Sequence, residues 1–213
     1  MSFLILFDLD GTLINSKADI ANAVNFSLAA EGFPTLPKAT IESFVGHGLM
    51  NLIEDVLGKP TPEEAKRVAQ QFKIYYDAHL LDETTLYPGV REFLESKAHH
   101  PMGVVTNKPY GFSKKILEGL KIDHYFKWLI GGDSLPVQKP SPKMLDPIFE
   151  SFPFSADTLL VGDSQIDVDC GKAAGIRTCG VTYGYRDRSE LIAAQPDFII
   201  DAFPQLQELP IFL

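Results

Sequence analysis

One short stretch near the N-terminus constrains the fold most: the five apolar residues Phe3-Leu4-Ile5-Leu6-Phe7, followed at once by Asp8-Leu9-Asp10-Gly11-Thr12. An apolar run without polar alternation predicts a strand that is buried on both faces, as in the parallel sheets of α/β proteins. Ligands of such sheets bind outside the carboxyl ends of the strands. Two carboxylates one residue apart repel each other unless a positive charge holds them. The sequence therefore predicts a metal ion at the end of this strand.

Two different patterns follow along the chain. Between about residues 17 and 83 the apolar residues have helical spacing, with Ser16 as a predicted N-cap and Ile20, Val24, Phe26 and Leu28 as the first apolar stripe. From Tyr87 onward, short apolar runs alternate with helical segments, which indicates a parallel sheet with right-handed crossovers. The expected strands are 102–105, 128–130, 158–161, 178–181 and 198–200, and the expected helices are 89–97, 111–119, 142–150, 165–174 and 187–194.

These patterns predict a doubly wound parallel-sheet α/β core that carries an inserted helical domain. The core would comprise residues 1–15 and 84–213, and a small helical cap domain would comprise residues 16–83. Because the first strand belongs to the same sheet as the later ones, the helical block interrupts the core directly after that strand.

Composition and charge argue against several classes of partner. The chain has 213 residues, 45% of them apolar, and a formal net charge of −9, which disfavours nucleic acid or an anionic membrane as the main partner. It shows neither a signal-peptide pattern nor an apolar stretch of the roughly 18 residues that span a bilayer. Cys170 and Cys179 lack the spacing of a metal or redox motif and are expected to be buried and reduced. We expect a cytoplasmic protein, a monomer or homodimer, that acts on a small molecule.

Four polar segments are expected to meet at one edge of the sheet. Each follows a predicted strand or lies in a loop beside one: Asp8 to Thr12, Thr106-Asn107-Lys108, Lys139-Pro140, and Gly162 to Asp167. Asp8, Asp10 and Asp163 offer oxygen ligands that suit Mg²⁺ better than zinc. Thr106 and Lys139 suit phosphate oxygens, since one supplies a donor and the other a point charge. A metal ion and a lysine together provide most of what phosphoryl transfer requires, and Asp167 is expected just behind the metal ligands.

These segments, in this order, resemble the motifs of the haloacid dehalogenase superfamily, and within it the phosphoglycolate phosphatase-like group. The matching stretches are DLDGT at 8–12, the threonine of VVTNK, the lysine of QKP and GDSQID at 162–167, together with the helical insertion after the first motif. The resemblance implies that Asp8 is the nucleophile and Asp10 the general acid and base. It further implies that Thr106 and Asn107 bind phosphate and that Lys139 orients it. The magnesium ligands that it implies are Asp8, Asp163 and the backbone carbonyl of Asp10.

The helical cap is expected to select the substrate. Gly46, His47 and Gly48 lie in a stretch that resembles the cap loop of phosphoglycolate phosphatases, and glycines at a helix start expose backbone N–H groups to an anion. His47 is a candidate donor to a substrate carboxylate, with a packing role as the alternative. Asn15 and Ile166 depart from the residues common in relatives, which bears on specificity more than on activity.

The favoured activity is a Mg²⁺-dependent phosphomonoesterase acting on a small phosphorylated metabolite, with 2-phosphoglycolate as the favoured substrate. A β-phosphoglucomutase-like phosphotransferase, a pyrophosphatase or a nucleotidase would use the same core and remain open. A dehalogenase is disfavoured because its leaving group needs no proton from Asp10. A non-catalytic phospho-acceptor or binding domain is the alternative from another class. Outside the motifs, Phe72, Tyr75 and Tyr76 are expected to pack within the cap. Tyr183, Tyr185, Arg186 and Arg188 are expected in a solvated loop, with a position lining the cleft as the alternative.

Overall fold

The computed structural model describes residues 3–152 and 158–212, and its centre is a parallel β-sheet. In this part of the chain the sheet has six strands in the order β5-β4-β1-β6-β7-β8, and every neighbouring pair is parallel. The strands are β1 (Leu4–Phe7), β4 (Met102–Val105), β5 (Trp128–Ile130), β6 (Thr158–Gly162), β7 (Arg177–Val181) and β8 (Phe198–Ile200). The predicted doubly wound α/β class is confirmed.

Alternate residues of β1 pack into different halves of the core. Ile5 and Phe7 belong to the cluster that includes the apolar side chains of α5 (Val90–Ser96) and α6 (Tyr110–Gly119). Leu4 and Leu6 belong to a second cluster on the opposite face, with α7 (Asp146–Ser151) and α8 (Gln165–Ala173). A final helix, α9 (Arg188–Ala194), packs on α8. Because helices cover both faces, β1 has no solvent-facing side, which explains its unbroken apolar sequence.

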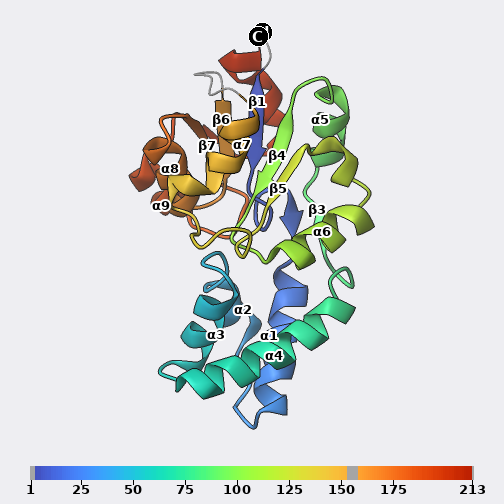
Figure 1. Ribbon diagram of the computed structural model, residues 1–213, viewed down its shortest axis with the longest axis vertical. Coiled ribbons are helices and arrows are strands. Elements are labelled where there is room, and N and C mark those ends of the chain that lie inside the picture. Colours follow the sequence, from blue (N-terminus) through green and yellow to red (C-terminus); the bar gives the residue numbers. More distant parts are fainter. Residues whose placement is uncertain (1–2, 153–157, 213) are drawn as a thin grey trace.

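Four helices lie beyond the carboxyl ends of the strands (Figure 1). They are α1 (Lys17–Ala30), α2 (Lys38–Glu42), α3 (Leu49–Leu57) and α4 (Pro62–Ala78). We call residues 16–83, which carry them, the helical insertion. Its two connections to the core pair with each other as a short antiparallel ladder, β2 (Ile14–Asn15) with β3 (Thr85–Leu86).

A buried carboxylate fastens these connections together. Asp19, in the first turn of α1, is 1% exposed and accepts hydrogen bonds from the backbone N–H of Glu83 at 3.0 Å and of Thr84 at 2.8 Å. The Thr84 hydroxyl donates a further bond at 2.7 Å. The insertion therefore leaves and re-enters the core through one cross-linked point.

Several local predictions change in detail. α1 begins directly after Ser16 as predicted, but the Ser16 hydroxyl does not cap the helix and instead donates to Asp10. Phe26 is 46% exposed and lies outside the buried stripe of α1. The β2-β3 ladder has no counterpart in the sequence prediction, because two-residue strands are too short to show a period. Cys170 and Cys179 are buried and free, as expected. No helix among the described residues is long and apolar enough to cross a membrane.

Candidate active site

The four predicted segments meet beside the end of β1, where the strand order reverses between β4 and β6. Backbone hydrogen bonds continue past the strand ends and fix the first polar residue of two segments: the N–H of Asp8 donates to the Val161 carbonyl, and that of Thr106 donates to the Ile130 carbonyl, both at 2.9 Å. Asp163 follows β6 in the same way in the sequence. This reversal point is where open α/β sheets bind their ligands.

Lys139 joins two acids of the site. Its Nζ lies 2.8 Å from Oδ1 of Asp8 and 2.6 Å from Oδ1 of Asp167, and Lys139 is only 5% exposed. Burial alone would lower the pKa of Lys139, but the carboxylates of Asp167 and Asp8 outweigh it and raise that pKa. The two carboxylates therefore favour the charged form of Lys139. Asp167 also accepts from the backbone N–H and hydroxyl of Ser164, so it completes the capping box at the start of α8 and also holds Lys139.

The same region concentrates negative charge. Carboxylate oxygens of Asp8, Asp163 and Asp167 all lie within 4.8 Å of one another. Burial raises the pKa of Asp8 to about 6, with Asp167 adding to the rise and Lys139 opposing it. Burial, then Asp167 and Asp8, also raises the pKa of Asp163 well above its ordinary value. Clustered buried carboxylates with a single ammonium have the donor chemistry of a magnesium site, and the residues present fit that ion.

Two glycines make room for Asp163. A Cβ on Gly11 would lie 2.2 Å from Oδ2 of Asp163, and a Cβ on Gly184 would lie 2.2 Å from its Cβ. Gly11 also has a φ of +82°, which other residues rarely adopt. The backbone N–H of Tyr185 donates to Oδ2 of Asp163 at 2.6 Å. Asp163 is thus packed against glycine backbone on two sides.

Asp10 has a different set of partners from Asp8. The Ser16 hydroxyl donates to its Oδ1 at 2.5 Å, and Nζ of Lys108 lies 3.1 and 3.0 Å from its two oxygens. Lys108 also donates to the hydroxyl of Tyr76 on α4 at 2.7 Å. The side chain of Asp10 is therefore separate from the cluster of Asp8, Asp163 and Asp167. Only the backbone carbonyl of Asp10 is left for the metal role that the resemblance implies.

Thr106 and Asn107 follow β4, the strand that pairs with β1 ahead of Asp8. Thr106 is 1% exposed, and its hydroxyl accepts from the Lys108 N–H at 3.2 Å. The Asn107 amide holds the backbone of Lys139: its Oδ1 accepts from the Lys139 N–H at 2.9 Å, and its Nδ2 donates to the Lys139 carbonyl at 3.2 Å. A longer bond of 3.4 Å joins Nδ2 to the Gly46 carbonyl of the helical insertion. Asn107 therefore holds the loop that carries Lys139 and also contacts the helical insertion.

A cavity lies between the strand ends and the helical insertion. Its polar lining residues are Asp8, Asp10, Thr106, Asn107 and Lys108, and its apolar lining includes Leu49, Leu52, Phe72 and Phe112. Gly46 and Gly48 also line it. The predicted site residues of the core and two of the three predicted cap residues are thus brought to neighbouring positions.

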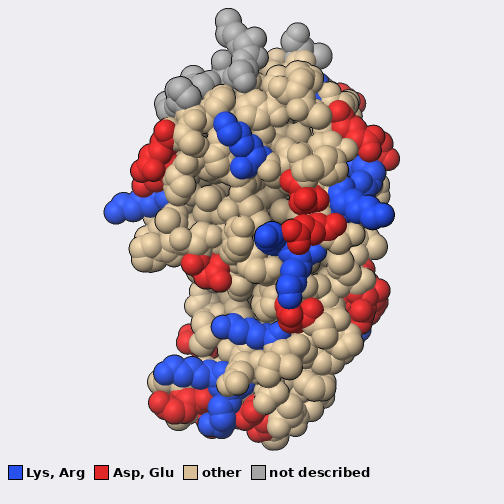
Figure 2. Space-filling view, turned by 45° about the vertical axis from the view of Figure 1, so that its right-hand side comes forward, with Lys and Arg blue, Asp and Glu red and all other residues tan. Residues whose placement is uncertain are grey.

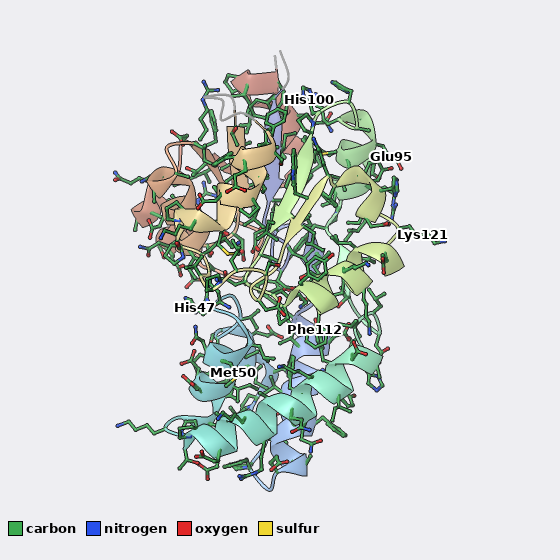
Figure 3. The ribbon with its side chains drawn as sticks, in the orientation of Figure 1. His47, Met50, Glu95, His100, Phe112 and Lys121 are labelled. Atoms are coloured by element: carbon green, nitrogen blue, oxygen red, sulfur yellow. The ribbon has the colours of Figure 1, made fainter. Side chains whose placement is uncertain are left out.

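His47 is placed differently. It is exposed and lines an outer cavity that it shares with Lys73, Lys115 and Gln138, and not the cavity of Asp8 and Asp10. Figure 3 shows it at the boundary between the helical insertion and the core, with Met50 below it and Phe112 on α6 across from it. Figure 2 shows that the surface is indented between the core and the helical insertion, and that basic and acidic residues alternate on that face.

The loop after β7 contributes to the site, and the expectation of a solvated loop is wrong for three of its residues. The Tyr185 hydroxyl accepts from the Ser16 N–H at 2.8 Å, and the Tyr183 hydroxyl donates to the Thr12 carbonyl at 2.9 Å. Arg186 donates to the carbonyls of Ser43 and Val45 at 2.6 and 2.7 Å. We call residues 43–48 the cap loop. Arg188 does lie at the surface, paired with Asp201.

Sequence reasoning also missed Lys108 as a partner of Asp10, and Tyr76 as a partner of Lys108. Lys108 belongs to the second motif but had no predicted role, and Tyr76 was expected only to pack. Tyr76 does pack against Phe72 and Phe112, while its hydroxyl reaches Lys108. The nearest signal was the position of Lys108 directly after Thr106 and Asn107.

Fold and site together define a hydrolase whose carboxylates and lysines lie at the switch point of a doubly wound sheet. Residues 5–181 match the model of the haloacid dehalogenase-like hydrolase family, and the chain belongs to this family. It is 39% identical to the phosphoglycolate phosphatase of Haemophilus influenzae over 95% of this chain and 96% of that one. It is 37% identical to the phosphoglycolate phosphatase of Pseudomonas putida over 93% of this chain and 76% of the other.

The solved structures agree with these relatives. The structure of a predicted phosphoglycolate phosphatase from Haemophilus somnus superimposes with a TM-score of 0.90 and 35% sequence identity, covering 97% of each chain. The predicted family and the prediction of an enzyme, a phosphoric monoester hydrolase similar to phosphoglycolate phosphatases, are therefore confirmed.

Proposed function

We propose that the chain is a Mg²⁺-dependent phosphomonoesterase that works through an aspartyl-phosphate, with 2-phosphoglycolate as its substrate. The observation that carries the proposal is the unequal pairing of the two acids of the first motif. Asp8 contacts Lys139 beside the acidic cluster, whereas Asp10 contacts Ser16 and Lys108. Both acids line one cavity, so each can act on a different side of the same ester.

In this proposal Asp8 attacks phosphorus. A bond forms between its carboxylate oxygen and phosphorus as the bond from phosphorus to the ester oxygen breaks, and Asp10 donates a proton to the departing oxygen. Asp10 then removes a proton from a water molecule that attacks the aspartyl-phosphate, which returns Asp8 and releases phosphate. Lys139 and Thr106 supply charge and a donor to the phosphoryl oxygens.

Asp8, Asp163 and the backbone carbonyl of Asp10 would hold Mg²⁺, and Asp167 would hold Lys139 behind them. When bound, the ion would neutralise negative charge on the phosphoryl oxygens. Residues 16–83 would act as a cap that covers the substrate, with Gly46 and Gly48 lining the covered cavity.

The substrate assignment is supported by the relatives, which are named phosphoglycolate phosphatases, and by the cavity that the catalytic acids line together with apolar residues of the helical insertion. A phosphotransferase of the β-phosphoglucomutase type, a pyrophosphatase and a nucleotidase share the core chemistry. A cytoplasmic location and a monomeric or homodimeric state stay predictions.

Phosphate release tests the proposal directly. Purified protein with Mg²⁺ should release phosphate from 2-phosphoglycolate faster than from β-glucose 1-phosphate, pyrophosphate or nucleoside monophosphates, and EDTA should abolish release. Asp8→Asn should lower kcat by at least about 10³-fold, whereas Asp55→Asn, an exposed acid on α3, should leave it unchanged. Turnover of no ester in this panel would reject the proposal, and faster turnover of another member would replace the substrate.

A further inference from the structure

Lys108 places a buried positive charge in the wall of the candidate active-site cavity. The residue is 8% exposed, and its ammonium contacts both oxygens of Asp10 and the hydroxyl of Tyr76. Among the described residues that line this cavity, Lys108 is the only lysine or arginine. Burying an ammonium costs several kcal/mol of folding free energy unless its partners compensate. The buried position of Lys108 therefore suggests a function for its charge.

The pairing with Asp10 alone does not provide that explanation. Asp10 already accepts a short hydrogen bond from Ser16, and Lys139 already supplies an ammonium to the other motif acid. Lys108 is instead oriented by both the core and the helical insertion. Its backbone follows β4 in the core, and its Nζ contacts Tyr76 on α4 of the insertion. The ammonium therefore lies where the cap meets the catalytic acids.

The chemistry of the leaving group connects this position to the substrate. Asp10 is the residue proposed to protonate the ester oxygen, and Nζ of Lys108 lies 3.0 Å from it. In a phosphorylated α-hydroxy acid, the carboxylate carbon is only two bonds from that ester oxygen. A carboxylate on the leaving group would thus come close to Lys108 whenever the ester oxygen is close to Asp10.

We propose that Lys108, assisted by the Tyr76 hydroxyl, binds a carboxylate on the leaving group and so selects phosphorylated α-hydroxy acids over uncharged phosphate esters. This inference rests on the proposed function, and it assigns to Lys108 the role that the sequence suggested for His47. The remaining cavity lining from the insertion is largely apolar, including Leu49, Leu52 and Phe72, so it offers an uncharged leaving group no polar partner comparable to the ammonium. Charge-assisted hydrogen bonds in a buried site are strong enough to decide between such substrates.

Two phosphonates that cannot be hydrolysed test the carboxylate site without turnover. In 3-phosphonopropionate a methylene group replaces the ester oxygen of 2-phosphoglycolate, and propylphosphonate lacks the carboxylate. Isothermal titration calorimetry of the whole protein with Mg²⁺ should give a Kd about 10- to 100-fold lower for 3-phosphonopropionate than for propylphosphonate. Equal Kd values for the two compounds with the wild-type protein would overturn the proposal, whatever any variant does.

Variants then locate the site. Lys108→Met should remove the difference between the two phosphonates, Lys108→Arg should retain part of it, and Tyr76→Phe should reduce it less than Lys108→Met. Lys115→Met is the matched control, because this lysine lies on the outer cavity and pairs with the exposed Asp77. An undiminished difference in a folded Lys108→Met protein would refute the assignment. A wild-type protein that discriminates between the phosphonates but hydrolyses no ester would instead refute the proposed function and leave the carboxylate site in place.

Discussion

Replacing the proposed nucleophile should make the metal-free protein more stable. Asp8 is buried in a cluster of three carboxylates that share one lysine, and its pKa rises from 3.8 to about 6. An acid with a higher pKa in the folded state binds its proton more tightly there, so ionising it opposes folding. At about 1.4 kcal/mol per pKa unit, this shift corresponds to up to about 3 kcal/mol. Asp8→Asn removes the charge while preserving the shape of the side chain, and Lys139 keeps Asp167 as its partner.

The expected gain depends on pH in a defined direction. Below pH 3.8 Asp8 is protonated in both states and imposes no penalty, whereas above about pH 6 it is ionised in both and the full penalty applies. Urea unfolding in EDTA should therefore show Asp8→Asn more stable than wild type by up to about 3 kcal/mol at pH 7.5, and the difference should shrink steadily toward pH 4.5. The exposed Asp55→Asn should give no such slope. A variant that is less stable than wild type at pH 7.5, or a difference independent of pH, would refute the electrostatic reasoning.

Three further tests, two of them with a control variant, address other parts of the fold. Asp19→Ala should lower the free energy of unfolding by about 3 kcal/mol in urea denaturation, because two backbone N–H groups and a hydroxyl lose a buried charged acceptor; a loss below 1 kcal/mol would show that the connections hold without it. Arg186→Met should release the two cap-loop carbonyls and speed hydrogen exchange of residues 43–48 by about tenfold, as expected for loss of about 1.4 kcal/mol, whereas Arg188→Met at the surface should leave that exchange unchanged. Gly184→Ala should destabilise the protein by about 1–3 kcal/mol and impair Mg²⁺-dependent activity, since the added Cβ would overlap the side chain of Asp163. Gly111→Ala in α6, where a Cβ meets nothing within 4 Å, should stabilise by about 0.5–1 kcal/mol, and equal effects of the two alanines would contradict the packing argument.

Much of the core was predictable because its signals are local. A strand buried on both faces has to be apolar throughout, so β1, β4 and β6 are visible as runs, and the polar residue after each run marks a strand end. The prediction that Asp8, Thr106 and Asp163 lie together used this rule and the parallel order of the strands, whereas Lys139 was placed with them from its loop beside a predicted strand. The β2-β3 ladder was invisible because it contains one pair of short extended segments that only the finished fold brings together.

The missing parts of the site depend on contacts between distant segments. Ser16 and Tyr185 are 169 positions apart, and nothing in the loop after β7 has a period that would indicate a buried hydroxyl. Tyr76 follows the apolar stripe of α4, so its ring was predicted to pack, but the stripe does not show where its hydroxyl points. Lys108 could be placed near the site by sequence, whereas its choice of Asp10 as partner depends on how the helical insertion covers the strand ends.

The balance of charge at the site agrees with the proposed magnesium ion. Four carboxylates, those of Asp8, Asp10, Asp163 and Asp167, face two ammonium groups, so the ionised site has a net charge of −2 before a phosphate dianion arrives. Lys139 compensates Asp8 and Asp167, and Lys108 compensates Asp10. Among the described residues no lysine or arginine forms a salt bridge with Asp163, whose only hydrogen bond is from the Tyr185 N–H. Asp163 therefore lacks the direct lysine contact that the other three acids have, and a divalent cation at the proposed magnesium site would supply positive charge beside it. The two lysines remain on the sides of Asp8 and Asp10, where the phosphoryl and leaving groups are proposed to bind, so chain and cation supply positive charge to different parts of the same reaction.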